Sequence, residues 1–89
     1  MNGNAAMNGN AALRYGRRRP YTAAGIKRLP CCRCGGPAKT QWQVCADGNR
    51  YRPLCEKCDV ALNRLVLEWM GFDMILVENL LRDYEVKHG

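Results

Sequence analysis

The stretch CCRCGGPAKTQWQVCADGNRYRPLCEKC, residues 31–58, holds all six cysteines of this 89-residue chain. Within it, Cys31 and Cys34 form one C-x-x-C pair, and Cys55 and Cys58 form a second pair twenty residues further on. A C-x-x-C turn presents two sulfurs to one ion without strain, and two such turns supply the four tetrahedral ligands that Zn²⁺ prefers. The spacing therefore predicts one structural zinc ion bound by these four cysteines.

A disulfide framework or a set of redox-active cysteines is the alternative explanation for so many cysteines in a short chain. The N-terminal sequence MNGNAAMNGNAALRYGRRRP has no apolar core of the kind found in secretory signal peptides. We therefore expect a cytoplasmic protein, in the cytoplasm of the host cell if the chain is viral. Thiols stay reduced in that compartment, which favours the metal over disulfides.

No membrane span is expected. The most apolar stretch, from Val60 to Leu81, is interrupted by polar side chains that hydrocarbon would not accept, namely Asn63, Arg64, Glu68, Asp73 and Glu78.

Between the two cysteine pairs the sequence predicts a β-hairpin. Trp42 and Val44 alternate on one face of a first strand, and Arg50-Tyr51-Arg52 forms the returning strand. The turn residues Asp47-Gly48-Asn49 separate them, and an Asp-Gly turn between two such runs is typical of a hairpin.

After the second pair the pattern changes to that of two helices. In residues 59–70 the apolar side chains recur at helical spacing, as Leu62, Leu65, Val66 and Trp69. Gly71 suits the end of that helix and Asp73 can cap the next one, residues 73–87. The second helix has its own stripe, made of Val77, Leu80, Leu81 and Tyr84. We expect two antiparallel helices joined at Gly71-Phe72.

The expected architecture is a small, zinc-stabilised α+β fold with two parts. Residues 1–29 should form a flexible basic arm, and residues 30–88 a zinc-binding core with a C-terminal helical hairpin. A chain this short buries little surface and often needs a metal or a partner to hold its fold. The apolar core against the second helix should consist of Trp42, Leu54, Leu62, Leu65, Val66 and Trp69.

Three further residues could be mistaken for metal ligands. Cys32 lies next to a ligand and could compete with Cys31, although C-x-C spacing suits one ion less well. Cys45 lies in the hairpin, where we expect it to be a small buried apolar residue. His88 lies near the C-terminal end and is not expected to bind metal.

The order of a cysteine knuckle, a hairpin and a second knuckle that opens a helix resembles a treble-clef zinc finger. The segment PLCEKCDVAL, residues 53–62, is also similar to the phage recombination endonuclease VII family, a branch of the His-Me-finger nucleases. That resemblance implies a phage origin and a Mg²⁺ ligand at Asp59, with Asp47 the other acid of the hairpin.

The chain departs from that family at the catalytic base. These nucleases activate water with a histidine in the hairpin, and residues 31–58 contain none. Lys39 does not replace it easily, because histidine titrates near neutral pH without assistance. The sequence therefore favours a shared scaffold without catalysis, in which Asp59 is an acid at a helix N-terminus.

Charge is distributed unevenly along the chain. Residues 1–30 hold six Lys or Arg and no acid, residues 31–70 carry a net +2, and residues 71–89 a net −2. Arginine binds phosphate and tyrosine stacks on bases, so this pattern predicts nucleic-acid binding, to DNA or RNA. The predicted contacts are Arg14, Tyr15, Arg17, Arg18, Arg19, Tyr21, Lys27, Arg28, Lys39, Arg50 and Arg52. A tail that only solubilises the protein is the alternative.

A protein-interaction role is the second functional hypothesis. Residues 60–87 contain more apolar side chains than two helices can bury between them, including Val60, Leu67, Ile75 and Leu76. Such a surplus indicates a homodimer or a protein partner. A metal-dependent endonuclease is the third hypothesis, and the missing histidine leads us to expect that the chain is not an enzyme.

Overall fold

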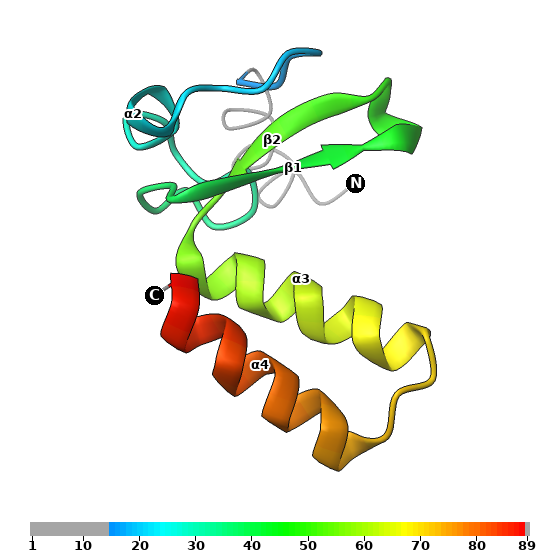
Figure 1. Ribbon diagram of the computed structural model, residues 1–89. Coiled ribbons are helices and arrows are strands. Elements are labelled where there is room, and N and C mark those ends of the chain that lie inside the picture. Colours follow the sequence, from blue (N-terminus) through cyan, green and yellow to red (C-terminus); the bar gives the residue numbers. More distant parts are fainter. Residues whose placement is uncertain (1–14, 89) are drawn as a thin grey trace. The chain divides into compact units, whose positions relative to one another are not determined.

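The computed structural model describes residues 15–88 of the chain, and it has a small α+β fold (Figure 1). The elements in chain order are α2 (Ala23–Ile26), β1 (Thr40–Val44), a 3-10 turn (Cys45–Asp47), β2 (Arg50–Leu54), α3 (Glu56–Trp69) and α4 (Met74–His88). The chain divides into two compact units. The first unit ends at Cys58, and the second begins at Asp59.

The hairpin of the first unit follows the predicted strands and turn. β1 and β2 pair antiparallel, with Thr40 opposite Leu54 and Val44 opposite Arg50. The chain reverses through Gly48 and Asn49, whose φ angles of 64° and 61° are both left-handed. Glycine adopts this conformation without steric cost, and asparagine is among the few other residues that tolerate it. The predicted hairpin is therefore confirmed.

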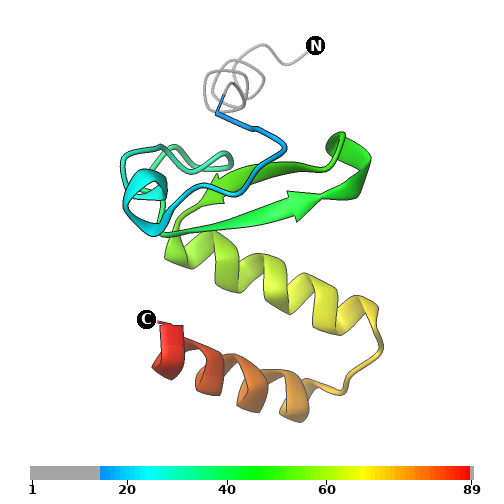
Figure 2. The same cartoon turned by 45° about the horizontal axis from the view of Figure 1, so that its top comes forward.

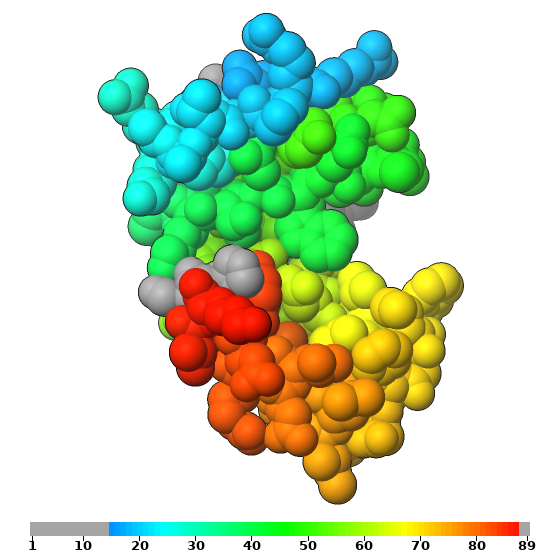
Figure 3. Space-filling model, viewed as in Figure 1, coloured from blue at the N-terminus to red at the C-terminus, as the bar shows by residue number. Residues whose placement is uncertain are grey.

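The segment of residues 15–21, called the arm segment below, lies on the hairpin. The backbone N–H of Tyr51 donates to the carbonyl of Arg17 at 2.6 Å, and that of Arg17 donates back at 3.3 Å. Tyr21 and Gln41 are joined by two further hydrogen bonds of 2.8 and 2.9 Å. In the space-filling view this segment, in blue, covers part of the green hairpin (Figure 3).

The first compact unit thus includes residues 15–29, which the sequence placed in a flexible arm. The physical reason is that the outer edge of β2 presents backbone groups that another segment can pair. Residues 1–14 of the predicted arm lie outside the described part of the chain.

The core of the first unit is small and lies around the cysteines. Ile26, from the short helix α2, is 2% exposed, and Ala38 and Leu54 are 4% and 6% exposed. Thr22 caps α2, because its hydroxyl oxygen accepts from the N–H of Gly25 at 2.9 Å. Of the predicted core residues in this unit, Leu54 is buried and Trp42 only half-buried.

In the second unit, α3 and α4 run side by side in opposite directions (Figures 1 and 2). Gly71, with φ 89°, ends α3. Its N–H donates to the backbone carbonyl of Glu68, and the N–H of Phe72 donates to the backbone carbonyl of Leu67. This is the hydrogen-bond pairing of a Schellman motif. The Asp73 carboxylate then accepts from the N–H of Leu76 at 2.9 Å and caps α4. The predicted helical hairpin and both of its caps are confirmed.

The predicted apolar stripe on α3 is only partly covered. Leu62 and Val66 are half-buried, whereas Leu65 is 61% exposed and Trp69 is 86% exposed. On α4, Val77 and Leu81 are buried at 1% and 2%. The expectation that Leu65 and Trp69 belong to the core is therefore wrong, because two helices without a third layer cover only a narrow stripe on each other. Within residues 15–88, no helix combines the length and apolarity that a bilayer-spanning segment requires.

Candidate metal centre

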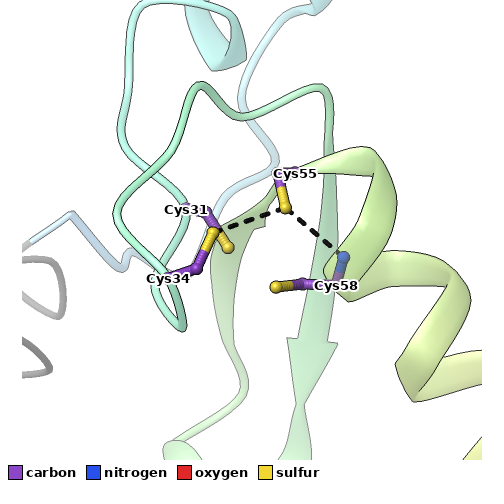
Figure 4. A group of neighbouring side chains, drawn as sticks. All are labelled: Cys31, Cys34, Cys55 and Cys58. Carbon is purple, nitrogen blue, oxygen red and sulfur yellow. Dashed lines mark hydrogen bonds between the residues drawn. The ribbon is translucent and has the colours of Figure 1, made fainter. Parts of the chain in front are cut away.

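Four cysteine side chains converge at one end of the hairpin (Figure 4). The Sγ atoms of Cys31, Cys34, Cys55 and Cys58 all lie within 4.8 Å of one another. Four sulfurs at 2.3 Å from a tetrahedral Zn²⁺ lie about 3.8 Å apart, so only small movements separate this cluster from a coordination shell. The four residues expected to bind metal are thus close enough to hold one ion.

The first knuckle, residues 31–36, is shaped by hydrogen bonds to sulfur. The N–H of Arg33 points to the Sγ of Cys31, and the N–H of Gly36 to the Sγ of Cys34, each at 3.4 Å. Gly35 adopts a left-handed φ of 81°, which lets the chain turn back so that Cys31 donates to the carbonyl of Gly36 at 2.6 Å. Amide groups aimed at sulfur stabilise the thiolate form that metals require.

The second knuckle, residues 55–58, is built on the start of α3. The N–H of Cys58 donates to the Sγ of Cys55 at 3.3 Å, so this sulfur occupies the place of an N-cap side chain. For this reason α3 begins at Glu56, three residues before the predicted start at 59.

Backbone hydrogen bonds hold the two knuckles beside each other. The N–H of Cys32 donates to the carbonyl of Pro53 at 2.8 Å, and that of Lys39 donates to Leu54 at 2.8 Å. The first knuckle is therefore attached to the end of β2, immediately before the second knuckle.

The pKa values of two ligands show the electrostatic conflict within a cluster of four thiols. Burial alone would raise the pKa of Cys31, but hydrogen bonds from the backbones of Cys34, Cys55 and Arg33 and from the Cys58 side chain lower it from 9.0 to about 6. For Cys58, burial and the three neighbouring sulfurs raise the pKa to about 12. A cation placed among the sulfurs relieves this repulsion, so the cluster suits a divalent metal.

The four clustered cysteines divide into an inner and an outer pair. Cys31 and Cys58 are buried, at 0% and 7% exposure, whereas Cys34 is exposed and Cys55 half-buried. A surface cavity of about 650 Å³ opens beside the outer pair. Its lining includes both outer sulfur residues and three lysines, Lys27, Lys39 and Lys57. Lys57 was not among the predicted site residues, although its place between Cys55 and Cys58 in the sequence could have indicated it.

The two remaining cysteines lie outside this cluster. Cys32 is half-buried, and burial followed by the charge of Cys31 raises the pKa of its thiol. Cys45 is exposed, which contradicts the expectation that it is buried. It begins the 3-10 turn at the end of the hairpin, in which no residue is buried.

Both acids suggested by the nuclease resemblance are engaged by other side chains. Asp59, only 4% exposed, accepts hydrogen bonds from the hydroxyl of Tyr84 and from Asn63 at 3.3 Å. Asp47 forms a two-point ion pair with Arg52, whose Nη2 lies 2.8 Å from Oδ1. That hydrogen bond lowers the pKa of Asp47.

The predicted nucleic-acid residues fall into three groups. Four of them bond to the backbone or stack within the first unit. Arg17 donates to the carbonyls of Arg19 and Pro20 at 3.1 and 2.9 Å and lies 4.1 Å from the centre of the Tyr21 ring. Arg18 donates to the carbonyl of Gly48, and Arg50 donates to that of Asp47. The Tyr21 hydroxyl donates to the backbone carbonyl of Tyr15.

Two more are paired with acids, Arg52 with Asp47 and Lys39 with Glu56 at 3.5 Å. The third group, Arg19, Lys27 and Arg28, is exposed. Tyr15 is half-buried, and Arg14 lies outside the described residues.

No family model, curated protein or solved structure matches this chain. Its function is therefore inferred from the chemistry and geometry of its own residues.

Proposed function

We propose that this chain is a treble-clef-like zinc module whose first unit binds nucleic acid. The observation that carries the proposal is a strongly basic unit built around four clustered cysteines.

Zinc is the ion that best fits the four cysteines. Thiolates are soft ligands, a tetrahedral S₄ shell is typical of zinc or iron, and the close spacing suits a single ion without inorganic sulfide. When bound, the ion supplies a rigid cross-link between the two knuckles. Elemental analysis of protein purified without added metal should find one zinc per chain, and a stoichiometric iron content would contradict the assignment.

The nucleic-acid proposal rests on how charge divides between the two units. Residues 15–58 carry ten Lys or Arg and two acids, a net charge of +8, whereas residues 59–88 carry three Lys or Arg and six acids, a net charge of −3. Four thiolates on Zn²⁺ add −2, which leaves the first unit at +6. Arginines that bond to backbone carbonyls keep their full charge, so this unit still attracts a polyanion.

A salt titration tests this proposal. Binding of a labelled oligonucleotide, as single-stranded DNA, duplex DNA or RNA, is followed by fluorescence anisotropy. Contact with three phosphates of a duplex should weaken binding about 40-fold between roughly 50 and 200 mM salt. The exposed residues Lys27 and Arg28 are then changed together to Gln, with Arg82 and Lys87 changed to Gln as the matched control in the second unit, so that each variant loses one Lys and one Arg. Binding that ignores salt, or that falls equally in both variants, contradicts the proposal.

We propose a binding role and not a catalytic one. The sequence has a single histidine, His88, and the Asp59 carboxylate is engaged by Tyr84 and Asn63. Zinc-loaded protein incubated with Mg²⁺ and branched or single-stranded DNA should leave the DNA intact. Cleavage that an Asp59→Ala variant loses would overturn this part of the proposal.

The apolar surface of the second unit favours a protein-binding or dimerising role as the second candidate function. Trp69, Met74, Ile75 and Val86 are between 75% and 86% exposed, which is unusual for large apolar side chains. Analytical ultracentrifugation should then show a dimer that Trp69→Lys and Ile75→Lys dissociate. A strict monomer that binds no hydrophobic dye would remove this candidate.

A further inference from the structure

We propose that Cys34 and Cys55 form an oxidation site, in which peroxide joins the two sulfurs in a disulfide and releases the metal. This inference rests on the proposed zinc binding and goes beyond it, because it assigns different chemistry to the outer and the inner ligands.

The sulfurs of the outer pair lie close together and face solvent. The Sγ atoms of Cys34 and Cys55 lie 3.5 Å apart, on the side of the cluster that faces solvent. Cys31 has no exposed surface and Cys58 is only 7% exposed. A small oxidant therefore reaches the outer pair before it reaches the inner pair.

A surface cavity gives a small oxidant access to the outer pair. Its volume of about 650 Å³ is far larger than peroxide needs, and both outer sulfur residues line it. Lys27 and Lys57 line the same cavity. The structure thus combines access for the oxidant and a second sulfur at one place.

Hydrogen peroxide is the two-electron oxidant of the proposed reaction. The Cys34 thiolate attacks one oxygen, the O–O bond breaks, and a sulfenic acid and hydroxide form. The Cys55 thiolate then displaces the sulfenic hydroxyl group, and the S–S bond forms. The two sulfurs together lose two electrons, and the two hydroxides take two protons from solvent to give two waters. The metal is left with two ligands and dissociates.

The Cys34–Cys55 disulfide differs from a disulfide within one knuckle in what it connects. A Cys34–Cys55 disulfide connects the two knuckles, as the metal does, so the hairpin between them stays closed. A disulfide between Cys31 and Cys34, or between Cys55 and Cys58, would leave the knuckles unconnected.

The test uses the full chain, first shown to contain one zinc. Peroxide is added while a chromophoric chelator records free zinc, and disulfides are mapped by mass spectrometry after alkylation. We expect one zinc released per disulfide, a Cys34–Cys55 cross-link, and recovery of zinc binding after dithiothreitol and zinc are added. Cys45→Ser, which removes an exposed thiol outside the cluster, should release zinc at the rate of the unmodified chain.

A second variant keeps a metal ligand while it removes the reactive thiol. Cys34→His should still bind zinc but release it to peroxide at least about tenfold more slowly. Where that variant does not bind zinc, the map of the unmodified chain decides the question alone. A disulfide within either knuckle, or oxidation that leaves zinc in place, overturns the inference. Protein that never contains zinc would instead overturn the proposed metal binding, so the two failures are distinguishable.

Discussion

The guanidinium of Arg52 lies between the carboxylate of Asp47 and the backbone of Gly16. It forms the two-point ion pair with Asp47, and a Cβ atom built on Gly16 would lie 2.1 Å from its Nη1 atom. The arm segment therefore passes over Arg52 at a point where a Cβ atom would require the Arg52 side chain to move.

We expect Gly16→Ala to lower the urea midpoint of the first unit, because the methyl group must displace Arg52 from Asp47. Urea unfolding of the zinc-loaded protein measures the change. In an Arg52→Ala background the same substitution should have little effect, and equal effects in both backgrounds would show that the crowding is unimportant.

Tyr84 gives a prediction about pH. Burial first, and then the hydrogen bond to Asp59, raise the pKa of its phenol from 10.0 to about 12. Because this pKa is higher in the folded than in the unfolded state, the protonated phenol stabilises the folded protein. This stabilisation is complete below pH 10 and is lost as the pH rises toward 12. Ultraviolet titration should show one tyrosine that ionises near pH 12, and this step should be absent in Tyr84→Phe. In Asp59→Asn it should move to lower pH, and an unchanged step there would contradict the assignment.

At this scale the sequence identified the four cysteines that come close enough to hold one ion, but not the hydrogen-bond partners of the arginines. Ligand chemistry depends on residue type and spacing, which are local. Arg18 instead bonds to the carbonyl of Gly48, thirty residues away, and this acceptor is placed only when the arm segment lies on the hairpin.

At the scale of the elements, the turn between α3 and α4 depends on one glycine. Gly71 has a φ of 89°, a conformation that costs any residue with a Cβ about 1 kcal/mol or more. We expect Gly71→Ala to lower the unfolding free energy of the second unit by roughly that amount, measured by thermal unfolding followed at 222 nm. Met70→Ala, at the neighbouring and exposed position, is the control and should change the midpoint little.

The hairpin and the helical caps could be predicted because their signals are short and contiguous. Asp47-Gly48-Asn49, Gly71 and Asp73 each act within a few residues of their place in the sequence. The short helix α2 was not predicted, since four residues are too few to show a helical period. The start of α3 was misplaced because a cysteine sulfur, and not an oxygen, occupies the capping position.

At the scale of the whole molecule, metal removal is the most informative perturbation. The first unit has a small buried core, and its four thiols repel one another once they are ionised. A chelator should therefore unfold this unit, because the binding free energy of a structural zinc is largely folding free energy. Loss of dispersed amide signals from residues 15–58 in NMR spectra would report it.

Cys31→Ser should reproduce the effect of the chelator in zinc-containing buffer, whereas Cys45→Ser should leave the spectrum of the unmodified chain. A metal-free chain with the same amide dispersion would contradict the prediction. The boundary between the two units falls inside α3, because the first three residues of this helix belong to the second cysteine knuckle.

That continuity of α3 links the metal to how the helix begins. The first turn of a helix is the slow and unfavourable part of its formation, since several residues are fixed for one hydrogen bond. Cys58 lies in that turn, and coordination would immobilise it before the remaining residues are ordered. The ion would then serve as a nucleus from which α3 propagates toward Trp69, so helix growth in this chain would start at the cysteines and proceed outward.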